Sequence, residues 1–127
     1  MVLQSLDNIE HTKVLRLSTG FPHLDRSFGS TMHGSIESIG MPCGRIVFAS
    51  GEPGVGKTRF GIAVIKNINA RGGKVLVFQG EVPPQEFKQW TGDVTYPRRF
   101  FVSDDTKIDM IIKYIRQEEP TFVVIDS

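Results

Sequence analysis

The chain has 127 residues, of which 39% are apolar, and its 15 basic and 14 acidic side chains leave a net charge of +1. This length fits one domain, and the balanced charge excludes a global field that would attract nucleic acid or a membrane surface. The single cysteine, Cys43, excludes an internal disulfide framework, and no run of residues resembles a membrane span or a signal-peptide core, so we expect a cytoplasmic protein.

The first part of the chain has weak patterning. We predict an N-terminal arm over residues 1–15 and a core domain over residues 16–127. Residues 29–44 (GSTMHGSIESIGMPCG) are rich in glycine and serine. This composition predicts a loop that holds a short strand at 35–39.

The pattern sharpens in the second part of the chain. The apolar run 45–50 (RIVFAS) predicts a strand buried on both faces. Residues 58–70 predict a helix, because Phe60, Val64 and Ile68 recur at helical spacing.

Strands and helices continue to alternate to the end of the chain. We predict strands at 74–79, 99–104 and 121–126, and helices at 83–90 and 106–119. The last helix carries a stripe of isoleucines, Ile108, Ile111, Ile112 and Ile115. The candidate residues for its N-terminal cap are Asp104, Asp105 or Thr106. This alternation predicts an α/β fold with a parallel sheet.

A glycine-rich loop between the first predicted strand and helix matches G-x-x-x-x-G-K-[ST]. Its glycines let backbone N–H groups point at phosphate oxygens, and the helix N-terminus adds partial positive charge. Lys57 would reach the β- and γ-phosphates of a nucleotide, and the Thr58 hydroxyl would bind Mg²⁺. The predicted phosphate-binding residues are Gly51, Glu52, Pro53, Gly54, Val55, Gly56, Lys57 and Thr58.

Two carboxylates follow predicted strands and are candidates for the same site. Asp126 ends the strand 121–126, which we expect beside the strand 45–50, and it could hold a magnesium-bound water or be a surface carboxylate. Glu81 follows the strand 74–79 and could orient or deprotonate an attacking water, or be an ordinary turn residue. Glu86, one turn later, is its rival.

Four blocks of the sequence together resemble a known family. In chain order they are LSTGFPHLDRSFG (17–29), GRIVFASGEPGVGKT (44–58), KVLVFQGEVPPQEF (74–87) and EPTFVVIDS (119–127). The set resembles RecA-type ATPases, and most of all the bacterial RadA/Sms DNA repair ATPases and the KaiC-like proteins. There, an S-T-G-x-x-x-L-D motif precedes Walker A, G-E follows the next strand, and V-I-D-S forms Walker B. The resemblance covers residues 16–127.

The resemblance implies a role for each candidate residue. Lys57 and Thr58 match the Walker A lysine and the magnesium-binding hydroxyl, Asp126 matches the Walker B aspartate, and Glu81 matches the catalytic glutamate. Lys57 and Glu81 are thus the expected catalytic residues, and Thr58 and Asp126 the expected metal ligands. The family further implies a P-loop NTPase fold of RecA type, hydrolysis of Mg-ATP, single-stranded DNA as a partner, and assembly into a homo-oligomeric ring or filament.

Other functions remain open at this stage. STGFPHLD and GEVPPQEF are also similar to DnaB-type replicative helicases, and a KaiC-like regulatory protein or a module that binds ATP or ADP without turnover would carry the same blocks. The loop 29–44 is longer than the usual link before Walker A, and the zinc ribbon of RadA is missing. Because the sequence stops at Walker B, we expect the N-terminal portion of a RecA-type core, truncated after that strand.

Overall fold

The computed structural model describes residues 2–10, 14–51 and 56–126. The chain forms two compact units, Met1–Ile46 and Val47–Ser127. The division between them falls inside the run 45–50. The predicted arm over 1–15 and core over 16–127 stay a prediction. In the described parts of the chain, no helix is long and apolar enough to cross a membrane.

The first unit is built from short elements. They are η1 (Leu6–Asn8), β1 (Arg16–Leu17), α1 (Pro22–Phe28), β2 (Ser30–His33), β3 (Ile36–Ile39) and β4 (Met41–Pro42). β1 pairs with β4 and β2 pairs with β3, both antiparallel. The short strand predicted at 35–39 is confirmed by β3, whereas the loop predicted for the rest of 29–44 is wrong where β2 and β4 lie. Gly34, with a φ of 66°, helps close the two-residue turn of the β2–β3 hairpin, while the sequence of β2 (STMH) lacks the apolar alternation that would mark it as a strand.

Arg16 connects the elements of the first unit. Its guanidinium donates hydrogen bonds to the Thr31 hydroxyl at 3.0 Å and to the carbonyl oxygens of Phe28 and Gly40, each at 3.1 Å. One side chain thus joins β1 to the end of α1, to β2 and to the residue before β4.

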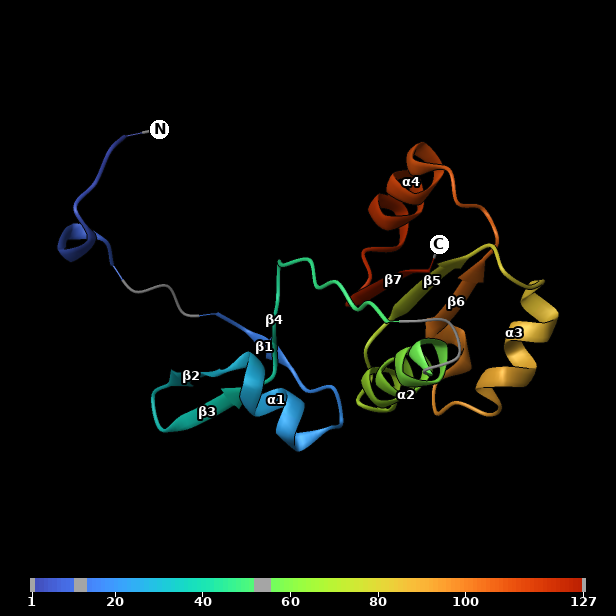
Figure 1. The fold of residues 1–127 in the computed structure, drawn as a ribbon, viewed down its shortest axis with the longest axis horizontal. Coiled ribbons are helices and arrows are strands. Elements are labelled where there is room, and N and C mark those ends of the chain that lie inside the picture. Colours follow the sequence, from blue (N-terminus) through green and yellow to red (C-terminus); the bar gives the residue numbers. More distant parts are fainter. Residues whose placement is uncertain (1, 11–13, 52–55, 127) are drawn as a thin grey trace. The chain divides into compact units, whose positions relative to one another are not determined.

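The second unit has an α/β fold with a parallel sheet, as predicted, and the strand order is β6-β5-β7 (Figure 1). Its strands are β5 (Val75–Gln79), β6 (Phe100–Ser103) and β7 (Phe122–Asp126). The other elements are α2 (Lys57–Ala70), α3 (Pro84–Thr91), η2 (Pro97–Arg99) and α4 (Ile108–Glu118). Every residue of the central strand β5 is buried.

Helices cover both faces of this sheet. Leu76 and Phe78 of β5 pack with Ile111 of α4 on one face. Successive strand residues point to opposite faces, so Val75 and Val77 point to the other face, where α2 contacts β5 and buries Val64, Ile65 and Ile68. The α/β fold with a parallel sheet, predicted from the alternating pattern, is confirmed.

The isoleucine stripe and the caps predicted for α4 need correction. Ile111 is buried, but Ile108 is 73% exposed and Ile112 is exposed too, because only one side of this helix lies on the narrow sheet. No side chain caps the helix at Lys107. The Asp105 carboxylate instead accepts a hydrogen bond from the backbone N–H of Lys107 and forms a turn before the helix.

The predicted buried strand at 45–50 is wrong. These residues form no strand, and Ile46 and Phe48 are 85% and 93% exposed. In the strand order β6-β5-β7 a further strand could pair only with the outer edge of β6 or of β7, and the run 45–50 pairs with neither. A strand buried on both faces needs a neighbour and covering helices, and an apolar run alone supplies neither.

Candidate functional site

Polar residues gather at the carboxyl edge of the parallel sheet. Gln79 of β5 lies opposite Asp126 of β7, and Ser103 of β6 lies opposite Phe78. Glu81 follows β5 after one residue, Gly80. In open α/β sheets, ligands bind outside the carboxyl ends of the strands. The two predicted carboxylates, Glu81 and Asp126, are thus brought to one edge.

The loop after β5 presents Glu81 to solvent while its backbone is held. The N–H groups of Glu81 and Val82 both donate to the side-chain oxygen of Gln79, each at 3.1 Å. Within the described residues, the Glu81 carboxylate itself has no hydrogen bond or ion pair. A carboxylate in this state is available to a ligand or a water molecule.

Asp126 is the last residue of β7 and is half-buried. The expectation that its strand lies beside a strand at 45–50 is wrong, because β7 pairs with β5 and 45–50 is not a strand. Its position at a strand end nevertheless follows the prediction.

The Walker A residues lie at the start of α2. Gly56 precedes the helix in the left-handed conformation, with φ 89° and ψ 22°, and Lys57 is the first helical residue. Gly56 has no side chain that could cap the helix, and the first N–H groups of a helix are a site where an anion can bind. Gly51 is exposed. The predicted ligands Glu52, Pro53, Gly54 and Val55 lie outside the described residues.

The start of α2 and the two carboxylates belong to the same layer structure. α2 contacts both β5 and β7, and only residues 71–74 connect it to β5. So short a connection makes the helix run antiparallel to the strand that follows. Lys57 and Thr58 therefore lie toward the carboxyl edge, which also carries Glu81 and Asp126.

The oxygen donors at this edge fit a magnesium ion. Thr58 offers a hydroxyl and Asp126 a carboxylate, and Mg²⁺ prefers such oxygen ligands. Across residues 2–10, 14–51 and 56–126, no three His, Cys, Asp or Glu side chains are grouped so as to hold a metal ion. This donor set is of the kind that holds Mg²⁺ through one or two protein oxygens together with nucleotide phosphates and water.

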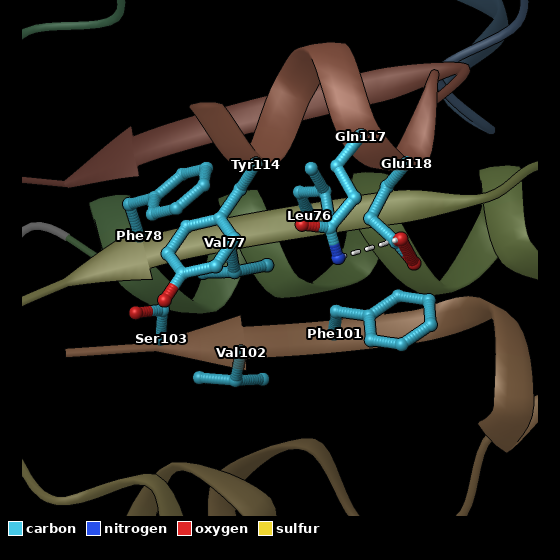
Figure 2. A pocket seen from close by; sticks show the side chains of 9 residues that line it. All are labelled: Leu76, Val77, Phe78, Phe101, Val102, Ser103, Tyr114, Gln117 and Glu118. Atoms are coloured by element: carbon cyan, nitrogen blue, oxygen red, sulfur yellow. Dashed lines mark hydrogen bonds between the residues drawn. The ribbon is translucent and has the colours of Figure 1, made fainter. Parts of the chain in front are cut away.

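A cavity of about 300 Å³ lies apart from these residues, between α4 and the sheet (Figure 2). Phe78, Phe101 and Tyr114 supply much of its apolar wall, and Ser103 and Glu118 lie at its polar parts. Neither Lys57, Glu81 nor Asp126 lines it.

Sequence reasoning missed one residue of this edge, Gln79. It ends a strand that is otherwise entirely apolar, and its side chain contacts the loop that carries Glu81. The signal was an amide residue placed directly before G-E at the end of a buried strand.

Comparison with known proteins gives one consistent result. No family model matches the chain. The chain is 29% identical over 126 residues to the DNA repair protein RadA of Pseudomonas aeruginosa, a match that covers 98% of the chain and 26% of that protein. It is 30% identical to RadA of Listeria monocytogenes over 118 residues, and 26% identical to RadA of Aquifex aeolicus over 113 residues. Both matches cover 88% of the chain and 23% of the relative.

The predicted resemblance to RadA is confirmed over most of the chain. The chain spans about a quarter of the length of these curated relatives.

Proposed function

We propose that this chain, which is similar to RadA proteins over nearly all its length, binds Mg-ATP at residues 51–58 and forms part of a DNA repair ATPase. The observation that carries the proposal is the start of α2 at Lys57, directly after a left-handed glycine, on a helix packed against the strands that end at Gln79 and Asp126. A G-K-T sequence at this position is what a phosphate-binding helix start requires.

Each polar group then has one task. The first N–H groups of α2 and the Lys57 ammonium bind phosphate oxygens. The Thr58 hydroxyl and the Asp126 carboxylate hold Mg²⁺, directly or through a bound water. A bound magnesium ion would neutralise charge that develops on the β- and γ-phosphates.

Glu81 acts on the water that attacks the terminal phosphate. Its carboxylate is exposed at the edge where the phosphates would lie, and no described group engages it. It accepts a hydrogen bond from the water and so orients it in line with the bond that breaks.

The action on DNA rests on the names of the relatives. All three are named DNA repair proteins. We infer that the whole protein couples ATP hydrolysis to work on single-stranded DNA and assembles as a homo-oligomer, with this chain contributing the nucleotide site.

Calorimetric titration of Mg-ATP and Mg-ADP into the chain tests the site. Lys57→Ala should weaken binding by about 100-fold, since a hydrogen bond to a charged group contributes up to about 3 kcal/mol. Lys107→Ala is the matched control, because Lys107 is also an exposed lysine at the start of a helix, α4. Its affinity should equal that of the unchanged chain.

Equal binding by all three proteins, or no binding by a chain that circular dichroism shows to be folded, would refute the Walker A assignment. A turnover assay with and without single-stranded DNA then separates the two parts of the proposal. Stimulation by DNA supports a repair motor, whereas binding without stimulation supports a nucleotide-binding module alone.

A further inference from the structure

Gln79 is a buried amide at the end of β5, directly before the loop that carries Glu81. Its side chain is 1% exposed, and it ends a strand whose other four residues are apolar. Burying an amide is unfavourable unless hydrogen bonds replace those that it made with water. The partners of Gln79 therefore show why this position tolerates a polar side chain.

All recorded hydrogen bonds of the Gln79 side chain go to the loop that carries Glu81. Its oxygen accepts from the N–H groups of Glu81 and Val82, each at 3.1 Å, and its Nε2 donates to the carbonyl oxygen of Val82 at 2.7 Å. The amide thus binds two successive residues just beyond the end of the sheet, where no neighbouring strand can pair with them. The Gln79 side chain thus holds the N–H group of Glu81 and both the N–H group and the carbonyl oxygen of Val82 in place.

The loop is also held on its other sides. Pro83 and Pro84 restrict the backbone where α3 begins. Gly80 lies against Thr106, whose Cγ2 would be 3.4 Å from a Cβ added at this glycine. The backbone around Glu81 therefore has little freedom, whereas its carboxylate remains exposed. A fixed backbone with an available carboxylate is the arrangement that a water-orienting group needs.

We propose that Gln79 is a positioning residue, which holds the Glu81 loop so that the Glu81 carboxylate meets the attacking water. The proposal rests on the function proposed above for Glu81. Gln79 itself touches neither nucleotide nor water in this role. Because the phosphates are bound by other residues, loss of the Gln79 contacts should lower kcat and leave the KM for Mg-ATP nearly unchanged.

The chain offers a matched control in Asn69. This side chain is 0% exposed, its Nδ2 donates to the Tyr96 carbonyl oxygen and its Oδ1 accepts from the Tyr96 N–H, both at 2.9 Å. It is thus a second buried amide that holds a loop. Tyr96 precedes η2 and β6, so this loop leads into the amino end of a strand, away from Glu81.

The test compares three variants of the whole chain by steady-state ATPase kinetics. Gln79→Met keeps the length of the side chain and removes its hydrogen bonds; kcat should fall about 10- to 100-fold, with a change in KM of no more than about twofold. Gln79→Glu keeps an oxygen that can accept from the two N–H groups but loses the donor to the Val82 carbonyl oxygen, so it should recover only part of kcat. Asn69→Leu should change kcat only in proportion to the fraction of folded protein.

Amide hydrogen exchange at Glu81 and Val82 supplies a second readout that needs no turnover. Protection should be present in the unchanged chain, lost in Gln79→Met and retained in Gln79→Glu. Loss of protection in Gln79→Met without loss of kcat would overturn the positioning role. Equal falls in kcat for Gln79→Met and Asn69→Leu would overturn it too, since both would then act through stability.

Failure of the proposed function has a different signature. In that case the chain is folded and its amides at 81 and 82 are protected, so the Gln79 clamp (the hydrogen bonds of Gln79 to Glu81 and Val82) is formed. The chain nevertheless shows no ATPase activity, or an activity that Glu81→Gln does not abolish. That result would refute the catalytic assignment of Glu81, and with it the positioning role. Unprotected amides in the unchanged chain would show instead that the clamp itself is absent.

Discussion

Asp25 and Glu81 are acidic residues of two motifs that resemble the same family, yet their surroundings are opposite. Asp25 is 6% exposed, and its carboxylate accepts from the Thr19 N–H at 2.8 Å and from the hydroxyls of Thr19 and Ser18, each at 2.6 Å. Glu81 is exposed, and only its backbone is held. A motif carboxylate can therefore either build the local fold or remain available for chemistry.

The difference follows from what each carboxylate does for its own loop. Asp25 reaches back from α1 and fixes residues 18–19 with its own oxygens, which leaves those oxygens engaged. The loop of Glu81 is fixed by a neighbour, Gln79. Because the Gln79 amide holds the loop, the Glu81 carboxylate has no partner among the described residues. The S-T-G-x-x-x-L-D motif is thus structural in this chain, whereas G-E is a candidate for catalysis.

The largest expected effect comes from Glu81→Gln. Removing the charge and the proton-accepting oxygen should lower kcat for Mg-ATP by about 10²- to 10⁴-fold, while unfolding by urea changes little, since no fold contact is lost. Glu86→Gln is the matched control, because Glu86 is an exposed glutamate one turn further along, in α3. If Glu86→Gln lowers kcat and Glu81→Gln does not, the assignment of the two residues must be exchanged.

Asp25→Ala should have the opposite profile. It leaves the buried N–H and hydroxyl of Thr19 without their acceptor, which should cost about 3 kcal/mol of unfolding free energy. Exchange of the Thr19 amide should report the loss within the first unit, while Mg-ATP binding at the second unit persists. The control is Asp109→Ala, an exposed acid in the first turn of α4, with an expected loss of about 0.5 kcal/mol. A stable Asp25→Ala variant that loses ATP binding would make Asp25 functional rather than structural.

The sequence predicted the second unit well because its elements have strong local signals. The strands at 74–79, 99–104 and 121–126 are short β-branched or aromatic runs, and they lie where predicted, to within a residue at each end. The helix predicted at 58–70 likewise begins one residue earlier, at Lys57, and ends at Ala70. Glu81 and Asp126 were placed correctly at one edge because parallel strands end together.

The remaining features depend on contacts that composition does not reveal. The run 45–50 has the composition of a buried strand, yet burial depends on pairing and on covering helices, and this run pairs with no strand of the sheet. β3 was predicted as a short strand at 35–39, but β2 lacks apolar alternation, so the rest of residues 29–44 was predicted as a loop. The side-chain contacts of Asp25 span at most seven residues and those of Gln79 at most three, but they include backbone N–H groups, which every residue except proline carries, so the sequence does not mark them.

The smallest expected effect is the loss of unfolding free energy when Arg16 is replaced. Arg16 is a basic residue that, like Asp25, holds the first unit together through its side chain. Arg16→Met keeps the apolar stem and removes three hydrogen bonds, but all three are only part-buried, whereas the bonds between Thr19 and Asp25 are buried. We therefore expect a loss of about 1–2 kcal/mol, below that of Asp25→Ala. The Gly40 amide, which donates to the Gly29 carbonyl oxygen at 3.1 Å, should exchange faster.

Arg26→Met is the control for this change. Arg26 is exposed, and among the described residues its side chain bonds only to the Pro22 carbonyl oxygen of its own helix, so its replacement should change stability by less than about 0.5 kcal/mol. Equal effects of the two substitutions would mean that Arg16 does not hold the first unit together. A larger loss for Arg16→Met than for Asp25→Ala would reverse the order. The guanidinium, rather than the carboxylate, would then be the group on which the fold around the S-T-G-x-x-x-L-D motif depends.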